Sequence, residues 1–379
     1  MSSTTLRDAC ERIDYGLTAS ARPDGGGPRF LRITDIDQSH VDWTTVPRCD
    51  ATPQEVEKYS LRTGDIVVAR TGASTGRSQW VQLSEPAVFA SYLVRFRVRS
   101  NVSSRFLGFV LQSRRWHRYI NANAHSKSAQ PNLSAARMAE FEFECPDLRT
   151  QRAIAEVLGA LDDKIAANTN SVAIAEDLLT ASYAATLKES PSEITVAEIA
   201  QFHNRKRVPL SSRERGSRPG SVPYYGATGV FGFVDEALFD EPLVLVGEDG
   251  SVVTAAGHPV VQYIWGPAWV NNHAHVLTGI GISTELLKVA LARSNVAPIV
   301  TGAVQPKISM GNLKRLPVLI PRPELRAGLE EKAARLTALL RSKTDEQKKL
   351  ASTRDVLLPA LMSGKVRVKD AERVVEEVV

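Results

Sequence analysis

Two copies of one sequence pattern follow each other along the chain, and this repeat is the strongest constraint on its fold. The dipeptide Gln130-Pro131 in the first copy corresponds to Gln305-Pro306 in the second, 175 positions later. Pro146 corresponds to Pro321 at the same offset. Because repeated sequence indicates repeated structure, we expect two versions of one domain in tandem.

Each copy closes with a long segment in which apolar residues recur every three or four positions. A period of 3.5 residues sustained over several turns predicts a coiled-coil seam. In the first copy the seam positions are Ile154, Leu158, Leu161, Ile165, Val172, Ala175 and Leu179. At the same register in the second copy stand Leu329, Ala333, Leu336, Leu340, Gln347, Leu350 and Arg354. The first segment has about 40 residues, so as a straight helix it would reach about 60 Å and act as a spacer.

Polar residues interrupt both seams near their middles. Asn168 occupies a seam position of the first helix, and Lys343 and Gln347 lie in the middle of the second. Two helices from repeated halves of one chain pack most simply in antiparallel fashion around a pseudo-twofold axis, which brings the two middles together. We therefore predict that these polar residues meet and define the register at some cost in stability. The alternative is that they face solvent.

The parts outside the long helices are predicted to mix strands with short helices. Strand-like runs bounded by Gly, Pro and Asn turns occur at 29–36, 64–70, 91–98, 242–247 and 259–265. Short helices are expected at 104–118 and 283–293. The predicted fold class is α+β, with two tandem mixed α/β domains that are each followed by a long helix. The expected boundaries are 1–147 for the first domain, 148–188 for its helix, 189–322 for the second domain, 323–362 for its helix and 363–379 for a tail.

The segment RTGASTGRS (70–78) is close to a phosphate-binding loop without matching one. Such a loop needs four residues between its glycines and then Lys-Ser/Thr, whereas Gly72 and Gly76 are three residues apart and Arg77 follows. The next residues favour a strand over a helix, so half of the usual anion site is missing. The matching segment VLVGEDG (244–250) keeps a turn glycine and has no basic residue. Both observations favour a plain turn between two strands.

Composition limits the classes of protein that the chain can belong to. Of its 379 residues, 43% are hydrophobic and 23% are charged, which is ordinary for a soluble globular protein of two or three domains. No apolar run approaches the roughly 20 residues of a membrane helix, and the N-terminus is unlike a signal peptide. Cys10, Cys49 and Cys145 are far apart, which favours a reducing, cytoplasmic environment. The net charge of +5 permits an anionic partner such as nucleic acid.

Motifs for catalysis are missing from the sequence. We find no Asp/Asn-Pro-Pro-aromatic element of an amino-methyltransferase, no HExxH, and no nuclease carboxylate pair followed by lysine. His273 and His275 alternate in NNHAHVL, so both could point to one face of a strand. A metal site, a contact to a base or phosphate, and an ordinary polar strand face all stay open for this pair.

The chain resembles the specificity subunits of type I restriction-modification systems over nearly its whole length. The strongest match is PDLRTQRAIAEVLGALDDKIAANTN (146–170). The segments VPYYGATGVFGFVDE (222–236) and LLPALMSGKVRV (357–368) resemble the opening of the family's second recognition domain and its C-terminal close. The elements that carry the strongest match are Pro146, Gln151, Ile154, Ala155, Leu158 and the run Asp162-Asp163-Lys164-Ile165.

The second long segment departs from the family pattern. Arg326 stands where Gln151 would map, and Arg354 stands where Leu179 would. The Asp-x-Lys-Ile element is also missing there, so the contacts of this helix with a partner are expected to be less typical.

The resemblance implies a subunit that reads DNA and is not itself an enzyme. Each domain would be a target-recognition domain for one half of a split double-stranded DNA site, and the helices would set the gap between the halves. Two methylation subunits would dock on the helices and bind S-adenosylmethionine, while restriction subunits would use ATP and magnesium. This chain would hold no cofactor or metal. A methylation-only modification system, or a coiled-coil scaffold with two protein-binding lobes, are the alternatives.

The candidate site residues follow from this reading. Phosphate contacts are expected from Lys and Arg, and base contacts from side chains with paired hydrogen-bonding groups. The candidates for DNA contact are Arg70, Thr71, Ser74, Thr75, Arg77, Lys127 and Gln130 in the first copy, and Arg205, Lys206, Arg207, His273 and Lys307 in the second. The candidates for the coiled coil and for partner contact are Gln151, Ile154, Leu158, Leu161, Asp162, Lys164, Ile165, Asn168, Leu329, Leu336, Leu340, Lys343, Gln347 and Leu350.

Overall fold

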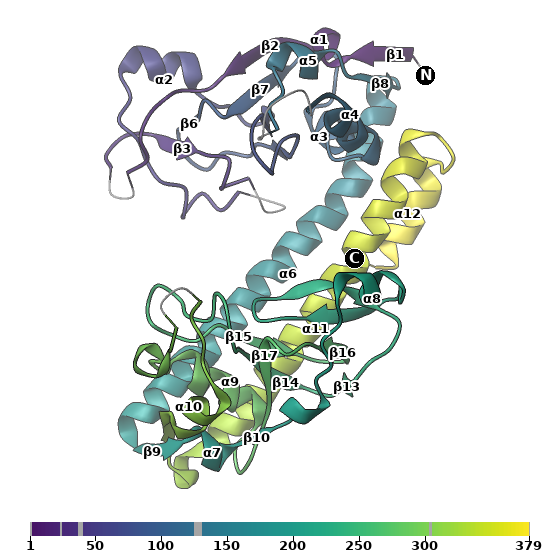
Figure 1. Cartoon of the computed structure of the whole chain (residues 1–379). Helices are drawn as coiled ribbons and strands as arrows, with labels where there is room; N and C mark the ends of the chain where they lie inside the picture. The colour runs from purple at the N-terminus through teal and green to yellow at the C-terminus, as the bar shows by residue number, and fades with distance from the viewer. Residues whose placement is uncertain (1, 23–24, 37–40, 125–130, 303–304, 379) are drawn as a thin grey trace. The chain divides into compact units, whose positions relative to one another are not determined.

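The chain divides into two compact units, each of which combines one globular domain with parts of the two long helices (Figure 1). Unit 1 comprises Met1–Asn170 and Thr344–Val379, and unit 2 comprises Ser171–Lys343. The computed structural model describes all residues except 1, 23–24, 37–40, 125–130, 303–304 and 379. Each unit is treated separately below.

Unit 1 contains a four-stranded antiparallel sheet in the order β2-β7-β4-β5. Two smaller pairs, β1-β8 and β3-β6, complete its strands. Its elements are β1 (Ser2–Thr5), α1 (Leu6–Ala9), β2 (Cys10–Tyr15), β3 (Arg29–Leu31), α2 (Pro53–Tyr59), β4 (Ile66–Ala69), β5 (Ser78–Trp80), β6 (Ala87–Phe89), β7 (Leu93–Val98), α3 (Ser104–Val110), α4 (Arg114–Ala124), α5 (Ala135–Ala139) and β8 (Glu142–Cys145).

One expected helix of unit 1 is in fact two. The single helix predicted over 104–118 is broken between α3 and α4, so this prediction was wrong in its extent. Ser113 causes the break, because its hydroxyl donates to the carbonyl of Val110 at 2.7 Å and accepts from the amide of Trp116 at 3.3 Å. A serine that bonds to nearby backbone in this way ends one helix and begins the next.

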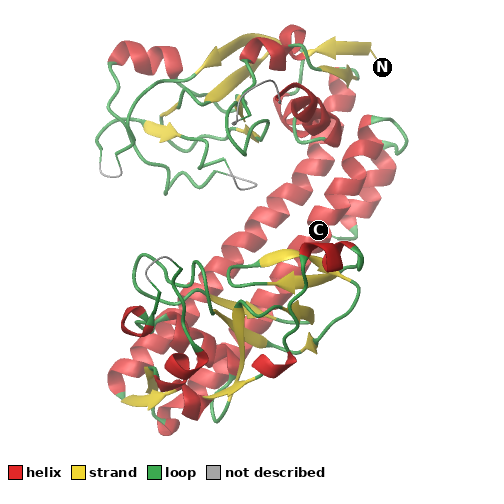
Figure 2. Ribbon diagram, in the orientation of Figure 1, coloured by secondary structure: helices red, strands yellow, loops and turns green. Residues whose placement is uncertain are grey.

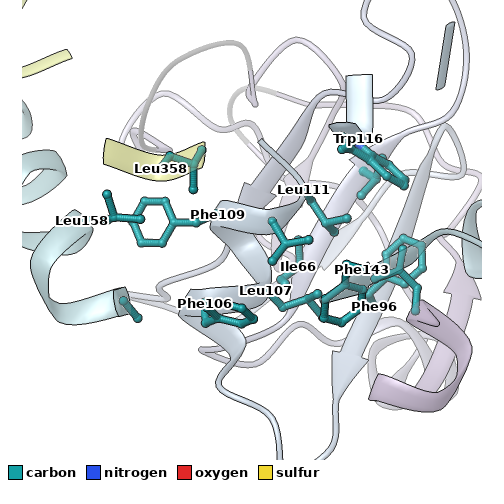
Figure 3. Close-up of a cluster of buried hydrophobic side chains, with 14 of the residues drawn as sticks. Ile66, Phe96, Phe106, Leu107, Phe109, Leu111, Trp116, Phe143, Leu158 and Leu358 are labelled. Atoms are coloured by element: carbon teal, nitrogen blue, oxygen red, sulfur yellow. The ribbon is translucent and has the colours of Figure 1, made fainter. Parts of the chain in front are cut away.

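The core of unit 1 extends from the sheet into the long helix α6 (Leu148–Glu189). Figure 3 shows Leu158 of α6 beside Phe109 of α3, with Leu358 of the last long helix close by. Leu158 is fully buried, and Phe109 and Leu358 are almost completely buried. The first seam positions of α6 therefore serve the globular domain as well as the helix pair.

Unit 2 repeats the architecture of unit 1. Its main sheet has the order β10-β17-β14-β15, and the pair β9-β18 corresponds to β1-β8, so the repeat read from the sequence is present in the strand topology. A second four-stranded sheet, β12-β11-β16-β13, is added. The elements are β9 (Pro191–Thr195), α7 (Val196–Ile199), β10 (Ala200–Phe202), η1 (Asn204–Lys206), α8 (Ser212–Gly216), β11 (Val222–Tyr225), β12 (Val230–Val234), β13 (Phe239–Asp240), β14 (Leu243–Gly247), β15 (Val261–Ile264), β16 (Pro267–Val270), β17 (Ala274–Gly279), α9 (Thr284–Ala292), η2 (Ala297–Ile299), α10 (Met310–Arg315) and β18 (Pro317–Pro321).

The helix α6 and the second long helix, α11 (Pro323–Met362), dominate the ribbon in Figure 2. Their pairing in unit 1 is antiparallel. Gln347 of α11 donates to the hydroxyl of Thr169 at 2.8 Å, and Arg354 reaches Asp162 at 2.8 Å, so the contacts advance along one helix as they retreat along the other. The predicted order of domain and long helix, and the antiparallel pairing, are confirmed.

Charged pairs explain one departure from the family pattern. Arg354 replaces an apolar seam residue, and its guanidinium bonds to the carboxylate of Asp162, with about a fifth of each side chain exposed. Burial raises the pKa of Asp162 above its ordinary value, and the charge and hydrogen bond of Arg354 offset only part of this rise. Lys164 lies 3.6 Å from Glu346 on the facing helix. The Asp-x-Lys-Ile element of α6 thus has acidic and basic partners on α11.

Asn168 is a buried polar residue on the seam. Only 2% of it is exposed, so the alternative that it faces solvent is wrong. Its Nδ2 has no hydrogen-bond partner among the described residues. Gln347 bonds to the neighbouring Thr169 and to the carbonyl of Ile165, so it does lie in the seam of unit 1. Lys343 belongs to unit 2, and its meeting with Asn168 stays a prediction.

The segment after α11 forms a helix that the sequence reading treated as a tail. The helix α12 (Val368–Glu376) buries Ala371 and Val375 in the core of unit 1. These two residues are four positions apart and therefore share one helix face. The C-terminal segment is thus part of the packing of unit 1.

Replacing Asn168 with Leu is expected to raise the melting temperature of the chain by several degrees. A buried donor without a partner costs about 1–3 kcal/mol, and an apolar side chain of similar size removes that cost. The exposed Asn170, two residues further on, is the matched control, and Asn170→Leu is expected to give no rise. Thermal unfolding followed by circular dichroism tests this, and an unchanged or lower melting temperature for Asn168→Leu would contradict it.

Candidate nucleic-acid interface

The segment RTGASTGRS forms the turn of a hairpin. Strand β4 pairs antiparallel with β5, and the turn between them closes on its own backbone. Its amides are used within the domain: Gly72 donates to Pro131, Thr75 to Gly72, Gly76 to Ala69, and Arg77 to Ser74, all at 2.8–3.1 Å. A phosphate cradle needs such amides to point at the ligand. The predicted turn between strands is confirmed.

Both turn glycines adopt backbone conformations that favour glycine. Gly72 has φ +75° and Gly76 has φ +88°. A Cβ atom on Gly76 would also lie 2.7 Å from side-chain carbons of Ile120, whereas the space beside Gly72 is open. Trp116 donates from its indole nitrogen to the carbonyl of Gly76 at 2.6 Å. Gly76 is therefore required for the hairpin to pack against α4, and not for approach to a nucleotide.

The same backbone frame holds the equivalent turn in unit 2. In unit 1, Gly72 donates to Pro131, and Leu133 donates to Arg70 at 2.9 Å. In unit 2 the amide of Gly250 donates to the carbonyl of Pro306, as Gly72 does to Pro131. The bond from the Leu133 amide to the Arg70 carbonyl corresponds to the bond from Ile308 to Glu248 in unit 2. The bond from the Arg70 amide to the Tyr92 carbonyl corresponds to the bond from Glu248 to His273. The two turns thus hold their residues in corresponding places.

The side chains around the turn of unit 1 form a polar and aromatic group that we call turn cluster 1. It consists of Tyr15, Arg70, Thr71, Tyr92 and Asn132. The guanidinium of Arg70 lies over the ring of Tyr15, 4.8 Å from its centroid, and donates to the amide oxygen of Asn132 at 3.3 Å. Tyr15 and Tyr92 are 42% and 60% exposed, so both rings are available to a ligand.

The corresponding group in unit 2, turn cluster 2, is charged. It consists of Arg207, Glu248, Asp249, His273 and Lys307. Glu248 bonds to Arg207 at 2.8 Å and lies 3.5 Å from Lys307, while Asp249 bonds to Nδ1 of His273 at 2.5 Å. Three residues predicted to contact DNA are therefore brought together, and two carboxylates that were not predicted lie among them.

Glu248 is the charge centre of turn cluster 2. Burial alone would raise the pKa of Glu248, but the hydrogen bond from Arg207 and the positive charges of Arg207 and Lys307 outweigh this and hold the pKa below its ordinary value. Arg207 also donates to the carbonyls of Ala274 and Asn204, at 2.7 and 3.0 Å. Its donors are largely used inside the domain, which favours a positioning role for Arg207 over contact with a phosphate.

The two histidines of NNHAHVL have different environments. His275 is fully buried, and burial lowers its pKa. One ring nitrogen lies 2.8 Å from the carbonyl of Ile308 and the other 2.9 Å from the amide nitrogen of Asn204, so it is a core histidine. The side chain of His273 is 49% exposed. Within the described residues, no group of three or more His, Cys, Asp or Glu is arranged to hold a metal ion.

The remaining predicted contact residues are not members of the two clusters, although Arg205 lines a pocket together with Arg207 and Glu248 of turn cluster 2. Thr75 uses its hydroxyl to bond the carbonyl of Gly72 at 2.7 Å, Ser74 is half-buried, and Arg77 is exposed at the end of the turn. Arg205 and Lys206 are exposed on η1, and Arg205 lines a pocket with Lys314. The predicted Lys127 and Gln130 lie outside the described residues.

A basic helix face was missed by the sequence reading. Helix α4 exposes Arg114, His117 and Arg118, which share one side because they are three or four positions apart. Burial and the nearby charge of Arg77 lower the pKa of His117, so Arg77 belongs to the same surface. The run RRWHR (114–118) could have indicated this basic face, but only a helix was predicted there.

Most of the predicted helix residues are buried as expected. Gln151 is buried but does not contact the other long helix through its hydrogen bonds. Its side chain accepts from the amide of Ser103 at 2.8 Å and donates to the carbonyl of Pro146 at 2.7 Å, and these bonds tie α6 to the start of α3. Leu336 and Leu340 are half-buried. The buried positions are Ile154, Leu158, Leu161, Ile165, Leu329 and Leu350.

These features define a protein of two tandem α+β domains, each followed by a long helix, with different polar clusters held in one frame. None of the described helices combines the length and the apolar content needed to cross a bilayer. Residues 35–174 match the family described as type I restriction modification DNA specificity domain. This match covers most of the first globular domain and the beginning of α6, and over that region the chain is similar to type I restriction-modification specificity subunits.

Individual relatives agree with this family. The chain is 31% identical over 143 residues to a protein described as a type I restriction enzyme specificity subunit of Haemophilus influenzae, an alignment that covers 38% of this chain and 36% of that relative. It is 21% identical to the type I restriction enzyme MjaX specificity subunit of Methanocaldococcus jannaschii, covering 96% of this chain and 93% of the other. The crystal structure of a type I restriction-modification S subunit from M. genitalium has the same fold, with a TM-score of 0.58 at 18% identity, covering 95% of this chain and 96% of that one.

Alanine substitutions at the two turn glycines are expected to differ in cost. Gly72→Ala introduces only a left-handed backbone strain of about 1–2 kcal/mol. Gly76→Ala adds a clash with Ile120, and overpacking of this kind costs a further 1–3 kcal/mol or so. Melting temperatures of the two variants test this directly. Equal losses would show that α4 does not pack on Gly76 as described.

Proposed function

We propose that this chain is the non-catalytic DNA-recognition subunit of a type I restriction-modification complex. Turn cluster 1 and the basic face of α4 contact one half of a bipartite double-stranded DNA site, and turn cluster 2 contacts the other half. The long helices set the unread gap and carry two methylation subunits. The chain itself contributes binding and no chemical step.

The observation that carries this proposal is one backbone frame with two sets of side chains. Corresponding hydrogen bonds hold the turns after β4 and β14, yet the positions around them differ in chemistry. The position of Arg70 is taken by Glu248, and that of Tyr92 by His273. Side chains that read base edges must differ where the bases differ, whereas the frame that presents them can stay the same. Two half-sites of different sequence account for this combination.

Phosphate contacts in unit 1 fit the exposed arginines. Arg114 and Arg118 are exposed on α4, and Arg77 is exposed at the end of the turn. Such a basic face attracts the DNA backbone and gives salt-dependent binding. In unit 2, Arg205 and Lys314 line one pocket and are the corresponding candidates.

Exposed apolar side chains on the long helices support partner docking. Ile174 and Leu178 of α6 are 66% and 44% exposed, and they are four positions apart on one face. Val356 of α11 is 67% exposed. Contiguous exposed apolar surface marks sites of protein contact, so the pair Ile174 and Leu178 is the stronger support for docking, and Val356 alone is weaker. On this proposal the docked methylation subunits bind S-adenosylmethionine, and a restriction subunit, where present, uses ATP and magnesium.

Mapping methylated adenines in the genome of a host that carries this chain with its methylation partner tests the proposal. We expect a split motif with a gap of unspecified bases between two different halves. A short continuous palindrome would contradict the two-half-site model. ATP-dependent cleavage of unmethylated DNA by the complete complex would distinguish a restriction system from a methylation-only one. If the complex shows no salt-dependent DNA binding at all, the coiled-coil scaffold is the alternative that stays.

Replacing Arg77 with Ala is expected to weaken DNA binding equally for all sequences. If the guanidinium meets one phosphate, the slope of log K against log salt falls by about one. Arg149→Ala is the matched control, because Arg149 is an exposed arginine at the start of α6 and away from the turn in sequence. Fluorescence anisotropy of the assembled methylation complex at several salt concentrations gives both slopes. An unchanged slope for Arg77→Ala removes this residue from the interface.

A further inference from the structure

The pair Asp249 and His273 has a chemistry that phosphate binding does not explain. Asp249 follows Glu248 in the turn of unit 2, and its carboxylate bonds to Nδ1 of His273 at 2.5 Å. The side chain of His273 is 49% exposed and that of Asp249 is 20% exposed. A carboxylate at a DNA surface is repelled by phosphates, so its presence in a recognition site calls for a different ligand.

The hydrogen-bonding state of the pair follows from its geometry. A carboxylate only accepts, so Nδ1 of His273 carries the hydrogen that it donates to Asp249. In a neutral imidazole the other nitrogen, Nε2, is then an acceptor. No further partner of His273 Nε2 or of the second carboxylate oxygen of Asp249 is recorded in the described part of the chain. With a neutral imidazole, the pair presents two acceptors to a ligand, Nε2 of His273 and the second carboxylate oxygen of Asp249.

The surrounding frame holds this pair in place. The side-chain oxygen of Asn271, which is 6% exposed, accepts from the amide of His273 at 2.8 Å, and Glu248 donates its amide to the carbonyl of His273 at 2.8 Å. The next residue in the turn, Gly250, is bonded to Pro306. Side chains held in this way lose little freedom on binding, which favours selective recognition.

A concave surface lies beside the pair. Asp249 and His273 line a pocket together with Asn271, Gln305 and Phe231. Phe231 is 58% exposed and its ring lies against Gly226, where a Cβ atom would be 2.3 Å from the ring. Arg215 also lines the pocket, but its guanidinium donates to the carbonyl of Leu210 at 2.8 Å and to the hydroxyl of Ser212 at 3.2 Å. The pocket thus offers acceptors, amide groups and an aromatic edge beside a guanidinium that the domain itself holds, which suits the edge of a base.

We propose that Asp249 and His273 accept hydrogen bonds from the exocyclic amino group of an adenine or a cytosine in the half-site that unit 2 reads. In the major groove these two bases present an amino donor, whereas guanine and thymine present carbonyl acceptors. In unit 1, Thr71 occupies the position of Asp249, and Tyr92 that of His273, so this preference belongs to one half-site only. The inference rests on the proposed DNA-recognition function.

The variant Asp249→Asn changes the outward group while it keeps the contact to His273. The amide oxygen can still accept from Nδ1, which leaves the NH₂ group facing the ligand as a donor. We expect the preference at one position of one half-site to shift from adenine or cytosine towards guanine or thymine, with discrimination there changed by about tenfold to a hundredfold. The other half-site is expected to stay unchanged.

Two readouts on the assembled methylation complex test this. Methylation mapping in the host gives the motif of wild type, Asp249→Asn, His273→Gln and the control Asp235→Asn, an exposed acid of the same unit that pairs with Arg218 at 2.9 Å. Binding to duplexes in which the amino-bearing base is replaced by an analogue without that amino group gives the direct measure. Wild type and Asp235→Asn are expected to lose affinity for the analogue, and Asp249→Asn and His273→Gln are each expected to lose less, because each variant keeps only one of the two acceptors.

The failing outcomes are distinct. Tighter binding of Asp249→Asn to all sequences, with an unchanged motif, would overturn the inference and leave Asp249 as a repulsive charge only. Equal analogue sensitivity in wild type and both variants would overturn it as well. If wild type itself gives no gapped motif, the proposed function fails instead. If Asp249→Asn does not fold, His273→Gln provides the test by itself. The side chain of His273 is half-exposed, so its replacement is expected to leave the fold intact.

Discussion

The hydrogen bond from Gly72 to Pro131, repeated as Gly250 to Pro306, is the constraint on which both candidate sites depend. It ties the turn of a hairpin to the segment after a Gln-Pro dipeptide, and the positive φ of Gly72 and Gly250 makes the turn possible. Around this bond several backbone amides of each turn donate to carbonyls of the same domain, so side chains at the turn can vary without loss of the frame. The same frame carries Arg70 in one unit and Glu248 in the other.

The helix pair shows how a polar seam can be both specific and costly. Asp162 and Lys164 of α6 face Arg354 and Glu346 of α11, and these opposite charges favour one register in unit 1. Asn168 adds a buried donor without a partner among the described residues. Burial of such groups lowers stability, but it also disfavours other alignments of the same helices.

Sequence reasoning reached the repeat, the two long helices and the turn, because each depends on local spacing or on glycine chemistry. It also named Arg207, His273 and Lys307, which lie together in turn cluster 2. It missed the carboxylates of that cluster, the aromatic rings of turn cluster 1 and the basic face of α4. The carboxylates and the rings come together from segments far apart in the sequence, and no single motif joins them, whereas the basic residues of α4 lie in one run that was interpreted only as part of a helix. The helix α12 was missed because its apolar face is short.

The sequence by itself determined the number of domains, the order of domain and long helix, and the resemblance to a known family, since periodicity and motif spacing are properties of the chain. Only the tertiary structure decided what each polar residue does. It separated the buried His275 from the exposed His273, and it showed that Arg207 is held by Glu248. The reason is physical: burial and hydrogen-bond partners depend on which distant segments meet, and a side chain's role follows from them.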